Sequence, residues 1–347
     1  METLWFCLVS AIFGLYVVFD GFDLGVGIIH LWVGKEQSER RLILRSIGPV
    51  WDGNEVWLLA GGGTLHFAFP AVYASAFSGF YLPLMIVLWL LILRGIAIEF
   101  RNHVEDILWI QAWDVVFSLS SLLLALFYAA TLGNVVRGVS LSGEGIFFNP
   151  LWTNFRPGPD TGILDWYTIP VGLTGVLALT LHGALWVSMK TGGATQERAR
   201  NVVRWSWKLA SLFALIATLL SFLIQPQIAV NLAARPWGYL FPTLAVAGLA
   251  GVAWFHGKKE DTKAFLASCT FLMGMLASAA FGIYPYFLPS ISGAIGLGVP
   301  NAAASPYGLR VGLVWWSLGM TLVMGYFVFI YRHFAGKVSL EDEAGHY

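Results

Sequence analysis

Long hydrophobic segments alternate with short polar connections along almost the whole chain. About 20 consecutive apolar residues are needed to cross a bilayer as an α-helix. Nine segments approach this length, and the connections between them are too short to hold a separate soluble domain. The pattern therefore predicts an all-α polytopic membrane protein with one transmembrane domain and nine membrane-spanning helices, at about 3–31, 51–69, 75–98, 113–136, 166–189, 209–229, 239–256, 264–288 and 309–331.

The composition agrees with a membrane protein and excludes several other classes. Hydrophobic residues make up 57% of the 347 residues and charged residues only 12%, against about 25% in soluble domains. The formal net charge is zero, which argues against nucleic acid as a partner. Both cysteines lie in apolar segments and are expected to be buried thiols rather than a disulfide or metal ligands. No basic stretch precedes the first apolar segment, so we expect a retained helix and not a signal peptide.

Lysine and arginine are distributed unequally between the two ends of the predicted helices. Sixteen of them lie in or beside the connections after helices 1, 3, 5 and 7 and in the C-terminal tail, whereas the opposite side has four. Positive residues are enriched on the cytoplasmic side of membrane proteins. We therefore expect the N-terminus outside, the C-terminus in the cytoplasm, and two long outer loops at about 137–165 and 289–308.

Two acids interrupt the first apolar segment. An ionised carboxylate at the centre of a bilayer costs about 2.5–3.5 kcal/mol even on the mildest scale, so such residues usually have a function. Asp20 and Asp23 are three residues apart and share one helix face. Gly21 and Gly25 permit another helix to approach closely, so the acids are expected to face protein rather than lipid. Proton handling and a purely structural bond to a neighbouring helix both remain open for this pair.

A further acid follows at the predicted cytoplasmic start of the second segment, in the tetrapeptide Trp51-Asp52-Gly53-Asn54. The helix dipole would stabilise Asp52 there, and Trp51 is typical of a membrane interface, so both also have a structural explanation. Asp23 is expected to lie toward the same side of the membrane. The convergence of Asp23 and Asp52 favours a proton route that starts from this face.

Arg94 and Glu99 lie at the predicted cytoplasmic end of the third segment. An arginine at membrane depth needs a carboxylate or a water-filled cavity, and Glu99 or an acid of the first two segments can be its partner. The alternative is that Arg94 is an anchor whose side chain extends to the interface.

The histidines bear on a competing hypothesis, a haem-binding cytochrome subunit. His66 and His182 alone lie well inside apolar segments, and their positions do not form the facing pairs that ligate haem in four-helix bundles. We therefore expect this chain to ligate no haem and no metal. A proton-coupled secondary transporter is the other alternative, and it predicts inverted repeats or broken helices, which the sequence does not indicate.

Several strings that contain polar residues follow one another in the first part of the chain: Asp20-Gly21-Phe22-Asp23-Leu24-Gly25-Val26-Gly27, Glu39-Arg40-Arg41, Trp51-Asp52-Gly53-Asn54-Glu55-Val56-Trp57-Leu58, Val72-Tyr73-Ala74, Ala76-Phe77-Ser78-Gly79-Phe80-Tyr81, Arg94, Phe100-Arg101 and Trp113-Asp114. In these strings the chain closely resembles subunit II of the cytochrome bd-type quinol oxidases. The second half resembles that family in length and hydropathy, with local likeness near Lys190-Thr191 and Tyr284-Pro285.

The resemblance implies a fold of two four-helix bundles, about 1–136 and 166–288, plus one peripheral helix at about 309–331. It also implies a haem-free subunit of a heterodimer in a bacterial cytoplasmic (inner) membrane. The partner, subunit I, would carry two b-type haems and haem d, oxidise quinol near the outer face and reduce oxygen to water in an electrogenic reaction. Whether a structural quinone, a bound lipid or a small accessory subunit is also present is left open by the sequence.

The resemblance further implies a proton path from the cytoplasm along acids that match Asp23, Asp52 and Glu99. Glu99 departs from the well-known form, which has the shorter acid there, so the geometry of the relay can differ. Trp51 matches a position tied to assembly of the haem site, and Arg94 would be the charge partner of a relay acid. The sequence thus predicts a proton conduit that also gives structural support to subunit I.

Overall fold

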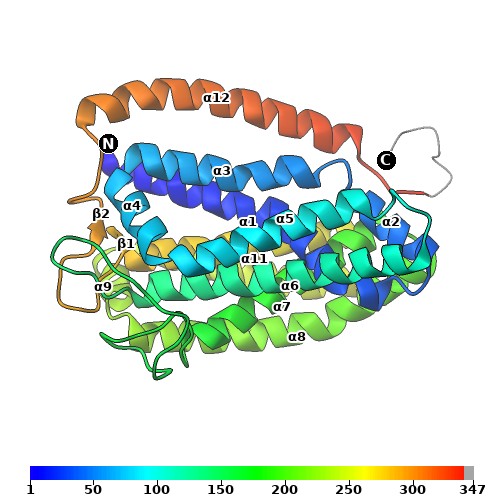
Figure 1. Ribbon diagram of the computed structural model, residues 1–347, viewed down its shortest axis with the longest axis horizontal. Coiled ribbons are helices and arrows are strands. Elements are labelled where there is room, and N and C mark those ends of the chain that lie inside the picture. Colours follow the sequence, from blue (N-terminus) through cyan, green and yellow to red (C-terminus); the bar gives the residue numbers. More distant parts are fainter. Residues whose placement is uncertain (340–347) are drawn as a thin grey trace.

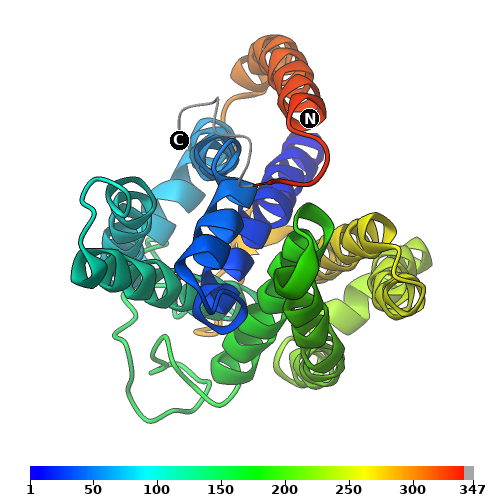
Figure 2. The same ribbon diagram turned by 90° about the vertical axis from the view of Figure 1, so that its right-hand side faces the viewer.

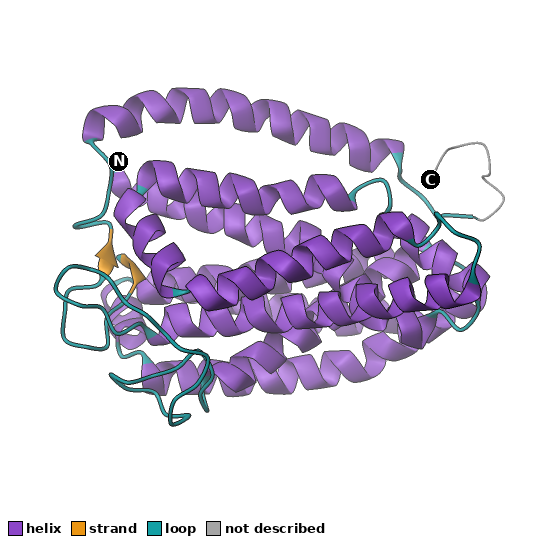
Figure 3. Ribbon diagram, viewed as in Figure 1, coloured by secondary structure: helices purple, strands orange, loops and turns teal. Residues whose placement is uncertain are grey.

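The computed structural model describes residues 1–339 and consists almost entirely of helices, which confirms the all-α class (Figure 1, Figure 3). The long helices run roughly parallel to one another, and a short antiparallel pair of strands lies at one end. In chain order the described elements are α1 (Glu2–Val33), α2 (Gln37–Ile47), α3 (Trp51–Ala68), α4 (Pro70–Gly79), α5 (Tyr81–Phe100), α6 (Ile107–Arg137), α7 (Thr168–Lys190), α8 (Gly193–Ile224), α9 (Gln227–Ala234), η1 (Pro236–Tyr239), α10 (Leu240–Gly257), α11 (Asp261–Ile283), β1 (Tyr286–Leu288), β2 (Leu297–Gly298) and α12 (Pro306–His333).

Eight of the described helices are long and apolar enough to cross a membrane: α1, α5, α6, α7, α8, α10 together with η1, α11 and α12. The remaining apolar segment that the sequence predicts as a crossing, 51–69, corresponds to α3. This helix packs along α1 but has only 18 residues, which include Asp52, Glu55 and three consecutive glycines. The count of nine crossings therefore stays a prediction, whereas length and composition support eight.

The apolar run at 75–98 is not one continuous helix. The chain leaves helical geometry at Phe80, between α4 and α5. Pro83 explains the break, because its ring has no N–H for the carbonyl of Gly79 and would clash with that carbonyl in a helix. The amide of Asn149 donates to the Gly79 carbonyl instead, over 3.2 Å. The predicted start of the third segment is therefore wrong, and its long helix begins at Tyr81.

Helix α1 is central and packs against α3, α6, α7 and α11. The backbones of α1 and α7 meet where Gly25 lies against Gly183, and a Cβ atom on either glycine would overlap backbone atoms of the other helix. The small residues of α1 thus admit a neighbouring helix at close range. This contact encloses the polar part of α1, and both Asp20 and Asp23 are buried.

Helix α12 lies at the edge of the bundle, apart from most of the other helices (Figure 2). Of its 28 residues, only Leu309 and Phe327 are buried. An apolar groove between α12 and α3 is lined by Trp5, Phe67 and Trp316 among others. Helix α12 therefore presents a large apolar surface to its surroundings.

Two long connections pack together at the end of the bundle where the N-terminus lies (Figure 1). The amide of Val139, after α6, donates to the carbonyl of Pro289 over 2.9 Å, and the amide of Ile291 donates to the carbonyl of Val139 over 3.1 Å. Side chains from both connections, Leu141 and Leu288 among them, share one apolar cluster. The two loops therefore form a single ordered cap.

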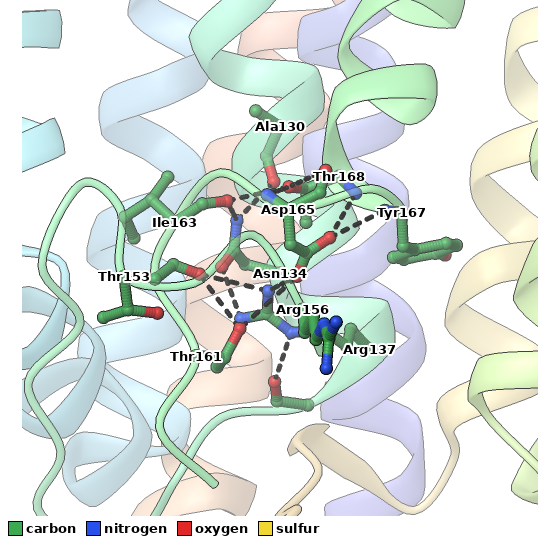
Figure 4. A network of polar contacts seen from close by, with 12 residues as sticks. Ala130, Asn134, Arg137, Thr153, Arg156, Thr161, Ile163, Asp165, Tyr167 and Thr168 are labelled. Carbon is green, nitrogen blue, oxygen red and sulfur yellow. Dashed lines mark hydrogen bonds and ion pairs between the residues drawn. The ribbon is translucent and has the colours of Figure 1, made fainter. Parts of the chain in front are cut away.

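A buried polar network fastens the base of this cap (Figure 4). Arg137, the last residue of α6, forms an ion pair with Asp165, and both side chains are buried. The same guanidinium donates to the carbonyl of Gly162 over 3.1 Å and to Asn134 Oδ1 over 2.7 Å. Asp165 in turn accepts from the backbone amide of Thr168 at the start of α7. The network therefore joins the end of α6, the loop and the start of α7.

We expect an Arg137→Lys variant to loosen the cap. Lysine keeps the charge but cannot reproduce the several directed bonds of the guanidinium, so the loss of stability should be about 1.5–3 kcal/mol. Limited proteolysis of the purified protein, with cleavage mapped within 138–167, measures the effect. Arg156→Lys is the matched control, because Arg156 lies on the same loop with an exposed side chain. Equal cleavage rates in the two variants would contradict this role of Arg137.

Candidate functional site

Three helices bring a buried arginine and two carboxylates together. Arg94 of α5 lies between Asp20 of α1 and Glu55 of α3. Its Nη2 atom donates to Asp20 Oδ1 over 2.7 Å and to Glu55 Oε2 over 2.9 Å. The side chains of Asp20 and Arg94 are fully buried, while that of Glu55 is 26% exposed. Arg94 therefore pairs with acids of the first two apolar segments and not with Glu99.

A second buried contact lies beside the first. Asn54 Nδ2 donates to Asp23 Oδ2 over 2.8 Å, and the hydroxyl of Tyr331 donates to Asn54 Oδ1 over 2.8 Å. Asp23 and Asn54 are both buried. Because Tyr331 belongs to α12, this line of hydrogen bonds connects α1, α3 and the peripheral helix.

The positions of these groups within their helices allow them to face one another. We call the five residues Asp20, Asp23, Asn54, Glu55 and Arg94 the acid cluster. The two aspartates are three positions apart, so they lie on one face of α1. The two residues from α3 are consecutive, lie near its start, and face α1 and α5 respectively. The arginine lies in the last two turns of α5 and completes the cluster from a third side.

Several buried polar atoms in and around the acid cluster have no hydrogen-bond partner among the described residues. They are Oδ2 of Asp20, Oδ1 of Asp23, Nε and Nη1 of Arg94, and the hydroxyls of Tyr16 and Tyr128. The two tyrosine rings are in edge-to-face contact with centroids 5.7 Å apart, and Tyr16 lies one helical turn from Asp20. Buried polar atoms without a protein partner normally bind ordered water. Carboxyls, a fixed cation and hydroxyls together are groups that can hold water and pass protons.

Two of the predicted relay acids, Asp52 and Glu99, lie outside the acid cluster. Both side chains are exposed in the isolated chain. Asp52 is the second residue of α3, and Glu99 follows Arg94 by five residues near the end of α5. Trp51 is half-buried and packs against the apolar core, with its ring beside Gly95. The structure thus places Asp23 in the same cluster as Arg94 and leaves Asp52 and Glu99 at the surface.

A second charged network surrounds Asp114 of α6. Its carboxylate accepts from His30 Nε2 over 2.7 Å, from Arg101 Nε over 2.6 Å and from Arg40 Nη1 over 3.1 Å. His30 and Asp114 are fully buried. In the sequence, Arg40, Arg101 and Asp114 are only separate members of the family strings, His30 belongs to none of them, and nothing shows that the four residues meet. Two guanidinium groups around one carboxylate make this a fixed ionic junction of α1, α2 and α6.

Close by, Glu39 of α2 forms an ion pair with Arg198 of α8. Burial acts to raise the pKa of Glu39, but hydrogen bonds from Arg198 and from the amides of Glu36 and Lys35 outweigh it, so the pKa lies below its ordinary value. Glu39 is therefore ionised at neutral pH and holds α2 to α8 as a fixed anion, which does not suit a proton carrier.

The two histidines inside the apolar segments have different surroundings. Both ring nitrogens of His182 are engaged, Nδ1 with Ser268 Oγ over 2.7 Å and Nε2 with the carbonyl of Val18 over 3.0 Å. His66 packs edge to face against Tyr73. Among the described residues, no group of three or more His, Cys, Asp or Glu side chains could hold a metal ion.

Comparisons with known proteins identify relatives along the whole chain. The sequence profile described as "Cytochrome bd terminal oxidase subunit II" matches residues 1–334. "Cytochrome bd ubiquinol oxidase subunit 2" of Bacillus subtilis is 30% identical over 345 residues, which are 99% of this chain and 98% of that protein. "Probable cytochrome oxidase subunit 2" of Haemophilus influenzae is 31% identical over 321 residues, which are 84% of this chain and 82% of that protein.

A solved structure has the same fold. A chain of the bd oxidase from Geobacillus thermodenitrificans is similar with a TM-score of 0.76, over 96% of this chain and 98% of that chain. The sequence identity is 18%, so this likeness concerns the fold alone.

Proposed function

This chain belongs to the cytochrome bd terminal oxidase subunit II family, and from that premise we propose that it is the haem-free subunit of a quinol:oxygen oxidoreductase. The family implies a subunit I as its partner. In the proposed complex, subunit I carries haems b and haem d, oxidises quinol and reduces oxygen to water in an electrogenic reaction. The present chain supports subunit I and delivers protons from the cytoplasm. The family match gives no support to the alternative of a proton-coupled transporter.

The proposed membrane arrangement follows the distribution of charge. The chain lies in the bacterial inner membrane with its N-terminus outside and its C-terminus in the cytoplasm, where most lysines and arginines then lie. Helix α3 is the ninth crossing. Its acids and glycines make it unsuitable for contact with lipid, so subunit I covers its exposed face. The first bundle is built from about 1–136, the second from about 166–288, and α12 is the peripheral helix.

The engaged nitrogens of His182 support placing all the haems in subunit I. When bound there, haem supplies the electron transfer and oxygen chemistry, while the residues of this chain handle protons. Trp51, packed beside the acid cluster at the start of α3, would support the haem site indirectly. A structural quinone or lipid, if the complex holds one in this subunit, has no assigned residues in this proposal.

The observation that carries the proposed proton path is the acid cluster. Three carboxyls are gathered there around one guanidinium, largely out of contact with solvent. If all three were ionised, two negative charges would lack a cation, and uncompensated buried charge is strongly unfavourable. The cluster therefore holds protons, and Asp23, which is bonded to a neutral amide, is the carboxyl best suited to bind and release one. Asp52 and Glu99 would collect protons at the cytoplasmic ends of α3 and α5.

An Asp23→Asn variant tests the path. It keeps the volume of the side chain but cannot carry a proton, so oxygen consumption with quinol should fall about tenfold, which corresponds to about 1.4 kcal/mol of added barrier. Rates are measured per assembled haem, together with proton uptake in liposomes that contain the purified complex. Asp52→Asn should slow uptake as well, because it removes a collecting group.

Asp160→Asn is the control, since Asp160 is an exposed carboxylate on the loop at the other end of the bundle. It should leave both rates unchanged. Wild-type turnover together with wild-type proton uptake in the Asp23→Asn complex would overturn the proposed path.

A further inference from the structure

Glu55 occupies the boundary between the acid cluster and the surface of α3. Its side chain is 26% exposed, whereas those of Asp20 and Arg94 are fully buried. The neighbouring Val56 and Leu59 of the same helix are 52% and 74% exposed. Asp52 precedes Glu55 by three residues, which brings these two carboxylates to one side of α3. Glu55 thus contacts the buried groups of the acid cluster and also borders the exposed face of α3.

Glu55 can leave its contact with Arg94 while the contact between Arg94 and Asp20 stays in place. Both carboxylates are bound through the single nitrogen Nη2, and neither receives the paired bonds of a bidentate guanidinium contact. Nε and Nη1 of Arg94, Oδ2 of Asp20 and Oδ1 of Asp23 remain without a partner among the described residues. When Glu55 leaves, Nη2 still holds Asp20, and the unpartnered atoms offer sites for water.

We propose that Glu55 is a relay residue that carries protons between the exposed face of α3 and the buried aspartates. The inference rests on the proposed function of the chain as a proton conduit. A proton collected by Asp52 passes through water to an Oε atom of Glu55, which becomes neutral and loses its ionic bond to Arg94. Once Asp23 has released its own proton toward subunit I, Glu55 gives its proton through water to Oδ1 of Asp23 and returns to Arg94 as a carboxylate. Each transfer moves one proton and leaves the charge of Arg94 unchanged.

The remaining groups of the acid cluster that lie near Glu55 cannot carry protons between the exposed face of α3 and the buried aspartates. Arg94 stays protonated in proteins, and Asn54 has no titratable proton, so neither can accept and release one. Asp20 is fully buried beside Arg94 and lacks contact with the surface. The competing explanation is that Glu55 only neutralises Arg94. That role requires an acceptor at Nη2 but no change of protonation.

A series of substitutions separates the two explanations in the intact oxidase. Glu55→Gln retains an oxygen acceptor for Arg94 and nearly the same volume, so a purely structural role predicts wild-type rates per haem. The relay predicts about tenfold slower oxygen consumption and proton uptake, with the haem spectrum unchanged. Glu55→Asp retains the acid but withdraws it by one methylene, so we expect an intermediate rate, about threefold below wild type.

The outcomes distinguish this inference from the proposed function. Wild-type uptake in Glu55→Gln, together with slowed uptake in Asp23→Asn, would remove Glu55 from the path and leave the conduit in place. Wild-type uptake in both would overturn both. If Glu55→Gln fails to assemble its haems, the Glu55→Asp complex decides, because a wild-type rate per haem there would also overturn the inference. Asp160→Asn remains the control for loss of a carboxylate elsewhere.

Discussion

An Arg94→Met variant is expected to yield almost no assembled oxidase. Methionine can fill much of the same space, but it removes the cation that binds Asp20 and Glu55. Loss of one member of a buried ion pair typically costs about 3–5 kcal/mol, because the remaining charge is left unpaired. This is a large share of the roughly 5–15 kcal/mol by which proteins are stable. The haem content of membranes and the yield of purified heterodimer measure the effect.

The matched control is Arg94→Lys. Because Arg94 reaches both carboxylates through one nitrogen, a single ammonium group can take over these two contacts. We expect this variant to assemble at a level far closer to wild type. A triple variant, Arg94→Met with Asp20→Asn and Glu55→Gln, should recover part of the lost yield, since it removes the unpaired charges as well. Accumulation of the single Met variant at wild-type level would show that the carboxylates do not depend on Arg94.

The long helices could be located from the sequence because the bilayer imposes a minimum apolar length on each crossing. The minimum apolar length of a crossing does not predict where each helix begins and ends. Helix α8 begins at Gly193, well before the apolar stretch predicted at 209–229, because its charged first turns pair with neighbouring elements, as Arg198 does with Glu39. Helix α2 lies within a connection that hydropathy treats as polar, although Glu36 and Glu39 form a capping box at its start.

The acid cluster was only partly predictable, because hydropathy shows which residues are costly in a membrane but not which helix faces meet. The burial of Asp23 and of Arg94 agrees with the sequence argument, since neither charge is tolerated by lipid. The sequence distinguishes Glu55 only as part of a family string, although its side chain contacts Arg94 directly. The meeting of Asp20, Arg94 and Glu55 depends on how α1, α3 and α5 are rotated, and that rotation results from packing over the whole bundle.

A Gly25→Ala variant is expected to prevent the close packing of α1 on α7. The added Cβ would overlap the carbonyl oxygen of Leu179 and lie 2.7 Å from the amide nitrogen of Gly183. Overpacking usually costs about 1–3 kcal/mol when side chains can adjust. Here the obstacles are backbone atoms, so the helices must separate, and we expect a loss of about 3 kcal/mol or more. Thermal unfolding of the purified complex and its yield measure this effect.

The consequence of this substitution should extend to the acid cluster. Asp23 is two residues from Gly25 and faces α3 from the other side of α1, so a shift of α1 relative to α7 also alters the contact between Asp23 and Asn54. Gly257→Ala is the control, because Gly257 ends α10 with nothing within 4 Å of its added Cβ, and alanine is there a better helix former. Gly257→Ala should therefore leave yield and stability unchanged or slightly raised. A Gly25→Ala complex that unfolds at the wild-type temperature would mean that the two helices do not pack at backbone contact in the membrane.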